Sequence, residues 1–276
     1  MNAKLKDTIK PLYRFFKIMW QLNIVKTLYV NFSKLPFLQA IHIPIYVYGG
    51  LKIDSLKGII VINQPLKTGM IKIGYDISGV PSSCLKSRLI IRGKLLFSGF
   101  ALIGRGSVIT VERDGELQIG NCCIIGCGCM VKSVLKISIG DGTRIASDCN
   151  LLDCNMHYVK DIETGIIKNN RAPIIIGTKC WINSGTIVGK GVILPNYCIT
   201  TRNSYLGKDY SSFGDNLFLA GSPAKILNIK VQRIFSSEEQ SRLSNYFKEH
   251  SNIDSIQVAK GLFEETNDED WFRWII

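Results

Sequence analysis

Residues 174–200 read IIIGTKCWINSGTIVGKGVILPNYCIT, and the spacing within this stretch decides the fold. An inward-type residue returns at every sixth position, in the series Ile176, Ile182, Val188, Leu194 and Thr200. A period of six is neither the alternation of a lone strand nor the roughly 3.6-residue period of an α-helix. It is typical of short strands joined by sharp bends, each strand sending one side chain inward to stack on its equivalents.

The same spacing extends toward the N-terminus in three further runs, separated by slips of register. The runs are Ile91, Phe97, Ile103, Ile109; Ile119, Ile125, Val131; and Ile139, Ile145, Leu151. A glycine often follows the apolar residue, and we expect it to relieve the bend: Gly104, Gly120, Gly126, Gly140, Gly177 and Gly189. The fifth residue of each hexad is small, as in Ala101, Ser107, Cys123, Thr143 and Thr186. We therefore predict a mainly β protein, with a parallel β-helix over residues 91–235 and coils spaced by about 4.8 Å.

The repeat fails between Leu151 and Ile176, where no regular hexads occur. Residues 152–175 are largely polar, so we predict a loop that leaves the coil. Long loops on repeat scaffolds are usually functional. This loop holds His157, one of only three histidines in the chain.

The flanking segments differ from the repeat. We expect residues 1–50 to be basic and helical, with a helix from Pro11 to about Val30. Residues 51–90 should be an irregular β lead-in, and residues 236–276 a C-terminal helical cap. Ser236 followed by Glu239 predicts a capped helix over residues 236–250, and the acidic tail after it should form another helix.

Composition narrows the class of protein. The 276 residues are 46% hydrophobic, with a formal charge of +12, which allows one or two globular domains. We find neither an apolar run of ~18 residues nor a secretory signal. Nine cysteines without a bridging pattern favour the reducing cytoplasm. A basic body suits a phosphate-bearing ligand, a nucleic acid or an anionic membrane, and charge alone does not choose among them.

The basic N-terminal segment has two interpretations. It could bind the cytoplasmic face of the membrane through residues 1–35 and bring the protein to lipid-linked sugars. It could equally pack on the coil or on another subunit.

Two motifs carry a resemblance to a known family. The hexads, followed by Cys180-Trp181-Ile182-Asn183-Ser184 and by Ala220-Gly221-Ser222-Pro223-Ala224-Lys225, resemble the hexapeptide-repeat acyltransferases. In particular, they are similar to O-acetyltransferases of surface-polysaccharide synthesis, over residues ~90–230. The resemblance implies a left-handed coil, a homotrimer and acetyl-CoA as co-substrate. The sequence departs from the family pattern at Asn183, where glycine is usual, and at Thr201-Arg202-Asn203, where Gly-Ala-Gly is usual.

The resemblance also implies a reaction. Acetyl would pass directly from acetyl-CoA to a sugar hydroxyl of a capsule, an O-antigen or another surface polysaccharide such as lipopolysaccharide. A hydroxyl is a poor nucleophile and needs a base of near-neutral pKa, for which histidine is the natural choice. His157 stands at the family's position for that base, so we predict that it takes the proton.

Further site residues follow from the same resemblance. The backbone N–H of Ser184 would stabilise the oxyanion, with Trp181 near the reacting groups. Asp153 and Asn155 would orient His157 or hold the acceptor. The alternatives are a turn residue for Ser184, packing for Trp181 and a turn cap for Asp153.

We expect basic side chains to bind the phosphates of acetyl-CoA. Lys208 and Lys225 stand at or near family cofactor positions, and Arg202 replaces a small residue where the cofactor arm would run. Solvated surface lysines are the alternative.

The cysteines do not predict a metal site. Cys123, Cys129, Cys149, Cys180 and Cys198 all occupy the small fifth position, where packing explains them. A four-cysteine zinc site also needs paired spacings that this chain lacks.

Other functions remain as alternatives. The acceptor could be an amino sugar or a small xenobiotic, and a non-catalytic β-helix binding module would also explain the repeat. A γ-type carbonic anhydrase needs three converging histidines, but His42, His157 and His250 are spread along the chain. A nucleotidyltransferase would carry a Gly-rich nucleotide-binding domain before the coil, and the roughly 90 residues that precede the coil contain no such loop. We expect no nucleic-acid partner.

Overall fold

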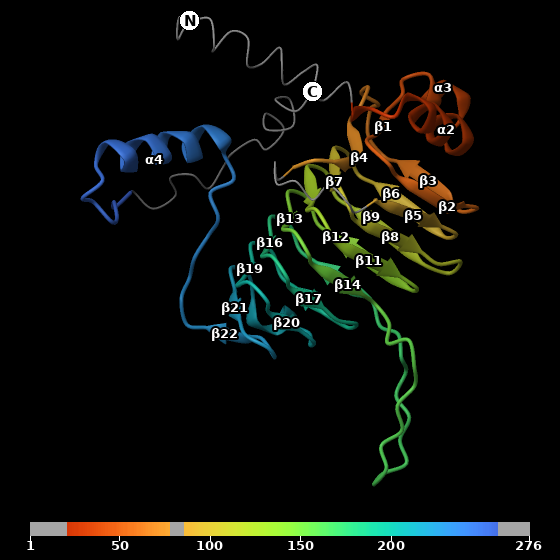
Figure 1. The fold of residues 1–276 in the computed structure, drawn as a ribbon. Helices are drawn as coiled ribbons and strands as arrows, with labels where there is room; N and C mark the ends of the chain where they lie inside the picture. Colours follow the sequence, from red (N-terminus) through yellow and green to blue (C-terminus); the bar gives the residue numbers. More distant parts are fainter. Residues whose placement is uncertain (1–20, 78–85, 259–276) are drawn as a thin grey trace, which may run out of the picture.

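Three sheets wind around one core in the computed structural model, which describes residues 21–77 and 86–258 (Figure 1). From β1 to β20, successive strands fall in different sheets, so each strand pairs in parallel with its equivalent one coil further on. The nine-stranded sheet holds β1 (Ile45–Val47), β4 (Ile71–Tyr75), β7 (Ala101–Gly104), β10 (Cys123–Ile125), β13 (Arg144–Ile145), β16 (Trp181–Ile182), β19 (Ile199–Thr200), β21 (Phe218–Ala220) and β22 (Lys225–Leu227).

The other two sheets complete the coil. The seven-stranded sheet holds β2 (Lys52–Leu56), β5 (Arg88–Ile91), β8 (Val108–Val111), β11 (Met130–Ser133), β14 (Asn150–Leu152), β17 (Ile187–Val188) and β20 (Tyr205–Leu206). The six-stranded sheet holds β3 (Ile59–Ile62), β6 (Lys94–Phe97), β9 (Glu116–Ile119), β12 (Lys136–Ile139), β15 (Ile174–Ile176) and β18 (Ile193–Leu194).

The predicted apolar anchors form the core of this stack. Ile125 pairs with Ile103 on one side and with Ile145 on the other, and Ile145 pairs in turn with Ile182. All of the predicted anchors, from Ile91 to Thr200, are at most 2% exposed. The expected fold, mainly β and built as a parallel β-helix of hexapeptide coils, is therefore confirmed.

The small fifth position of the hexad does more than save space. Its side chain donates to a backbone carbonyl of the next coil, as Cys123 Sγ does to Gly140 O at 3.1 Å. Thr143 Oγ1 repeats the contact to Gly177 O at 2.8 Å. Cysteine, serine and threonine suit this position because each is small and carries a donor. The packing role predicted for the cysteines is confirmed, since the five at this position are at most 1% exposed.

The hexad glycines act differently from the expectation. The left-handed φ values occur two residues later, for example at Gly106 (+77°) after Gly104 and at Cys122 (+55°) after Gly120. The glycines themselves lie where the next coil approaches closely. A Cβ on Gly126 would come within 2.5 Å of the Ala146 carbonyl carbon. Close stacking, rather than relief of the bend, therefore requires glycine there.

The stack begins earlier than the hexads suggest. Strands β1–β4 lie in the segment expected to be an irregular lead-in, yet they pair into the same three sheets. In this part of the stack the coils are longer than three hexads, since Ile45 pairs with Ile71, 26 positions on, and Ile71 pairs with Ala101, 30 positions on. The extra residues remove the six-residue period from the sequence.

Helices α2 (Ile24–Lys34) and α3 (Phe37–Ala40) cover the first coil (Figure 1). The helix expected from Pro11 to Val30 lies partly outside the described residues. Within them, Gln21 is helical, Leu22 bridges to Tyr48, and α2 starts with Asn23 as its N-cap. Side chains of α2 meet the free edge of β1. Asn31 bonds both the N–H and the C=O of Ile45, and Thr27 Oγ1 accepts from the Val47 N–H.

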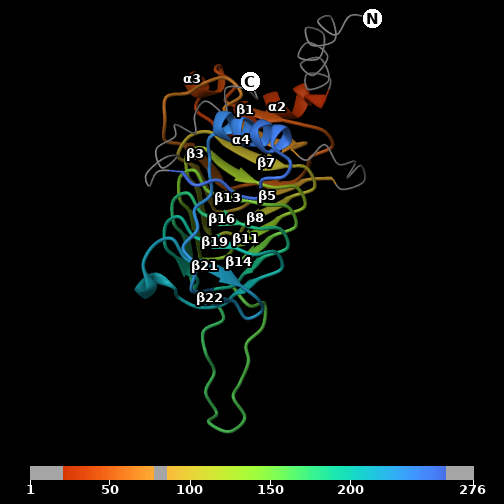
Figure 2. The same ribbon diagram turned by 90° about the vertical axis from the view of Figure 1, so that its left-hand side faces the viewer.

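The other end of the stack is closed by a hairpin. β22 pairs antiparallel with β21, and the short 3₁₀ turn η1 (Ser211–Phe213) precedes them. Residues 228–236 then run back along the nine-stranded sheet, where the Arg233 guanidinium lies 5.1 Å from the Trp181 ring centre (Figure 1). Helix α4 (Ser237–Glu249) starts at the predicted cap, Ser236, but it lies beside the stack instead of covering its end (Figures 1 and 2). The helix expected in the acidic tail lies outside the described residues.

Candidate functional site

The predicted loop between β14 and β15 projects away from the coil as a narrow two-stranded arm (Figures 1 and 2). Antiparallel bridges join Cys154 to Arg171 and Lys160 to Ile167 along the arm. At its tip, Asp161 Oδ1 accepts the backbone N–H groups of Glu163 and Thr164. The Thr164 contact is the main cause that lowers the pKa of the Asp161 carboxyl from its usual value. The arm therefore has a defined turn at its tip.

Asp153 fixes the root of the arm. Its side chain is fully buried, and its carboxylate accepts the backbone N–H groups of three consecutive residues, Val134, Leu135 and Lys136, at 2.7–2.8 Å. The hydroxyl of Ser133 lies 3.1 Å from the same carboxylate. These bonds hold the turn between β11 and β12. Asp153 was expected to orient His157 or hold the acceptor, and the structure gives it the alternative role of a turn cap.

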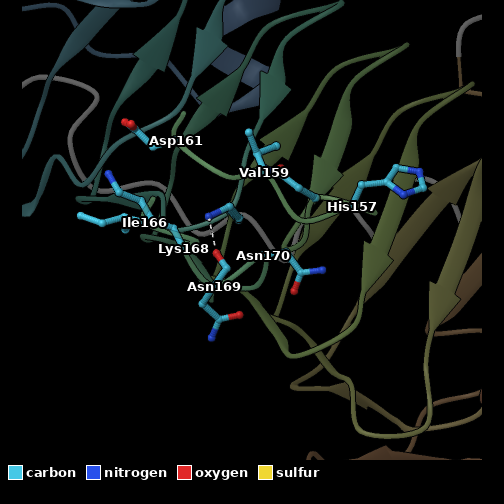
Figure 3. A pocket seen from close by; sticks show the side chains of 9 residues that line it. His157, Val159, Asp161, Ile166, Lys168, Asn169 and Asn170 are labelled. Carbon is cyan, nitrogen blue, oxygen red and sulfur yellow. Dashed lines mark hydrogen bonds between the residues drawn. The ribbon is translucent and has the colours of Figure 1, made fainter. Parts of the chain in front are cut away.

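His157 is exposed on the arm and lines a hollow of about 340 Å³. Asn155 lines the same hollow, and its backbone N–H donates to Asn170 O at 2.7 Å. Figure 3 shows the imidazole at one end of the group, turned away from Asp161 and Lys168. The structure thus brings together two of the predicted residues, His157 and Asn155, on one accessible surface.

Five polar residues of this hollow were not predicted: Asp161, Lys168, Asn169, Asn170 and Lys190. Lys190 comes from the coil after β17, and its ammonium donates to Asn169 O at 3.0 Å, which ties the arm to the stack. Lys168 supplies a second cation to the lining. Asn170 Oδ1 is a buried acceptor without a hydrogen-bond partner in the described part of the chain. No sequence motif marks these positions, because only the folded arm and its contact with Lys190 bring them into the hollow that His157 lines.

Trp181 and Ser184 lie elsewhere on the coil and do not line this hollow. Trp181 belongs to the nine-stranded sheet, whereas the arm leaves between the other two sheets. The Ser184 N–H, expected to bind an oxyanion, donates instead to the side chain of its neighbour Asn183 at 2.9 Å. The replacement of the usual glycine by Asn183 therefore supplies an internal partner for this N–H.

The three predicted phosphate-binding cations lie on the last coils. Arg202 is exposed in the turn between β19 and β20, and Lys225 is exposed at the start of β22. The ammonium of Lys208 lies 5.3 Å from the ring centre of Tyr210 and 5.4 Å from that of Phe213. All three side chains can meet an anionic ligand, since none is buried.

Metal ligands do not gather at this site. Among residues 21–77 and 86–258, no three side chains of histidine, cysteine, aspartate or glutamate converge closely enough to hold an ion. The buried thiols act in the core instead, and desolvation raises the pKa of Cys123 to about 12.

Comparison with known proteins indicates the kind of enzyme that this chain resembles. No family model matches the chain. The chain is similar to a probable acetyltransferase of Mycobacterium tuberculosis, with 29% identity over 126 residues, covering 42% of this chain and 38% of that protein. It is also similar to a provisionally named acetyltransferase of Dictyostelium discoideum, with 25% identity over 119 residues, covering 43% of this chain and 60% of that protein. The chain thus spans less than two thirds of either relative, and the predicted resemblance to acetyltransferases is confirmed.

Solved structures give two further similarities. The polysialic-acid-specific acetyltransferase NeuO has a TM-score of 0.45 and 20% identity, covering 73% of this chain and 99% of that one. The polysialic acid O-acetyltransferase OatWY has a TM-score of 0.42 and 21% identity, covering 71% of this chain and 96% of that one.

Proposed function

We propose that this protein is an acetyltransferase that moves the acetyl group of acetyl-CoA to a hydroxyl of a sugar. The observation that carries the proposal is His157, the exposed imidazole of an arm projecting from the coil, in a chain whose curated relatives are named acetyltransferases. We propose that the acceptor belongs to a surface polysaccharide, a choice that rests on the sequence resemblance. The cytoplasm is the proposed compartment, because the buried, unbridged cysteines of the described residues suit a reducing environment.

The proposed reaction needs a base and no covalent enzyme intermediate. The acceptor hydroxyl oxygen forms a bond to the acetyl carbon, and the carbon–sulfur bond of the thioester breaks. A ring nitrogen of His157 takes the hydroxyl proton, which then passes to the departing thiolate. A buried thiol cannot serve as a nucleophile here, since the Cys123 side chain is only 1% exposed.

The remaining predicted residues fit supporting roles in the proposal. Arg202, Lys208 and Lys225 offer exposed positive charge for the phosphates of acetyl-CoA. Asn155, Lys168 and Lys190 line the same hollow as His157 and carry groups that can bond sugar hydroxyls. Trp181 and Ser184 of the same chain lie outside the hollow that His157 lines. We therefore propose a homotrimer in which the arm of one chain reaches the coil of its neighbour.

An acceptor assay tests this function. The purified protein is incubated with acetyl-CoA and either neutral sugars or amino sugars, and thiol release is followed while mass spectrometry and NMR locate the new acetyl group. We expect acceptor-dependent release and an ester on a sugar oxygen. An amide product would show that the protein acetylates a nitrogen of an amino sugar instead of a hydroxyl. Absence of acceptor-dependent release, with sugar binding retained, would identify a binding module.

A further inference from the structure

Helices α2 and α3 present an apolar surface to solvent at the N-terminal end of the stack (Figure 1). Ile24, Val25, Tyr29, Phe37 and Leu38 are each at least 55% exposed. The rings of Phe32 and Phe37 lie 6.2 Å apart, which joins the two helices into one surface. We call this surface the α2–α3 face.

The outward direction of this surface follows from what α2 does on its other side. Asn31 and Thr27 are at most 3% exposed, because they bond the free backbone edge of β1. The buried side of α2 therefore carries Thr27 and Asn31 beside Val30, while most of its large apolar side chains face outward, unlike the usual arrangement. Contiguous apolar surface of this kind generally marks an interaction site.

The charge of this part of the chain indicates the kind of partner. Residues 21–77 contain only two acidic residues, Asp54 and Asp76, and six lysines, of which all except the buried Lys72 are at least partly exposed. Residues 1–20, which directly precede this region, add Lys4, Lys6, Lys10, Arg14 and Lys17 against Asp7 alone. Apolar and aromatic side chains combined with excess positive charge are typical of segments that lie in the headgroup region of anionic bilayers.

None of the helices in the described ranges has the length and hydropathy needed to span a bilayer.

We propose that the α2–α3 face docks on the surface of an anionic lipid bilayer. The exposed apolar side chains enter the boundary between headgroups and acyl chains, and the excess basic residues of this part of the chain attract the anionic lipid. Both views place the arm with His157 toward the opposite end of the molecule from α2 and α3 (Figures 1 and 2). A docked molecule would therefore hold the arm away from the bilayer, where a glycan extending from the surface can reach it.

Vesicle flotation of the full-length chain tests this proposal independently of acetyl transfer. The probes are vesicles of phosphatidylcholine alone and of phosphatidylcholine with phosphatidylglycerol. The test variant carries Phe37→Ser and Leu38→Ser, and a second variant carries Val25→Ser and Tyr29→Ser. The matched control is Ile229→Ser, which removes an apolar side chain of similar exposure (55%) far along the chain from the α2–α3 face. Thermal unfolding of each variant checks the fold.

The unaltered chain and Ile229→Ser should float with the anionic vesicles, and raised salt should weaken this binding. Each double variant should bind at least about tenfold more weakly, because two large apolar side chains are lost from the interface. Failure of the unaltered chain to float would overturn the proposal. Equal flotation of the double variants would also overturn it, since binding would then come from other residues. If the double variants change the oligomeric state but not the flotation, the α2–α3 face binds a second copy of the chain and not the bilayer.

Discussion

Asp153 and His157 lie on the same arm, close in sequence, but their environments differ completely. The carboxylate of Asp153 is buried against three backbone N–H groups, whereas the imidazole of His157 is exposed. The sequence alone could place both residues in a loop that interrupts the repeat. It could not reveal the partners of Asp153, because these N–H groups belong to the preceding coil and any residue type can supply them.

Replacing Asp153 with alanine should destabilise the fold. The substitution leaves three partly buried N–H groups of the turn between β11 and β12 without an acceptor, which should cost about 3 kcal/mol. Thermal and urea unfolding measure the loss. Asp161→Ala is the control, because that carboxylate also caps a turn but lies exposed at the tip of the arm. Equal stability of Asp153→Ala and the unaltered chain would contradict the structural role.

Asn183 allows the two roles left open for Ser184 to be separated. Its side chain accepts the Ser184 N–H, the group expected to bind the oxyanion. If that N–H acts in catalysis, Asn183→Gly should raise kcat severalfold, because the donor no longer has an internal partner. The measurement is steady-state acetyl transfer at saturating acetyl-CoA. An unchanged kcat would leave Ser184 as a turn residue.

At the scale of elements, the sequence predicted most where one hexad forms one side of a coil. Val188 and Leu206 are three hexads apart and pair directly. The earlier coils could not be recognised from the sequence because more than 18 residues separate their paired positions, as with Ile45 and Ile71. The position of α4 could not be predicted either. Its capping signal identifies where the helix starts, but the signal contains no information about what the helix contacts.

The small side chains between coils include the thiol of Cys123, so we expect the free energy of unfolding to fall at high pH. Desolvation raises the pKa of the Cys123 thiol to about 12. Between about pH 9 and 12 the unfolded chain loses this proton while the folded chain keeps it, so the free energy of unfolding falls by up to about 1.4 kcal/mol per pH unit. Cys123→Ser keeps a small donor that does not ionise. Its free energy of unfolding should therefore fall less steeply than that of the unaltered chain, and parallel curves would contradict this account.

At the scale of the whole molecule, the arm is the least compact feature of the structure. Its side chains between Asn155 and Asn169 are exposed, including Ile162 at 96%. An apolar tip side chain in this position is explained if a second chain covers it. We predict a trimer in sedimentation equilibrium, and Ile162→Asp should weaken it at least about tenfold, because a charge would be buried at the contact. A monomer at micromolar concentration would contradict the shared site.

The role of His157 is the central claim, and one comparison tests it directly. His157→Ala and His250→Ala are each assayed for acetyl transfer from acetyl-CoA to the accepted sugar, with acetyl-CoA affinity measured in parallel. His250 is the matched control, because its ring stacks on Tyr246 at the end of α4, away from the arm. The account predicts a loss of roughly 10²–10⁴-fold in kcat for His157→Ala with unchanged acetyl-CoA affinity, and near-normal transfer by His250→Ala. Near-normal transfer by His157→Ala would contradict it.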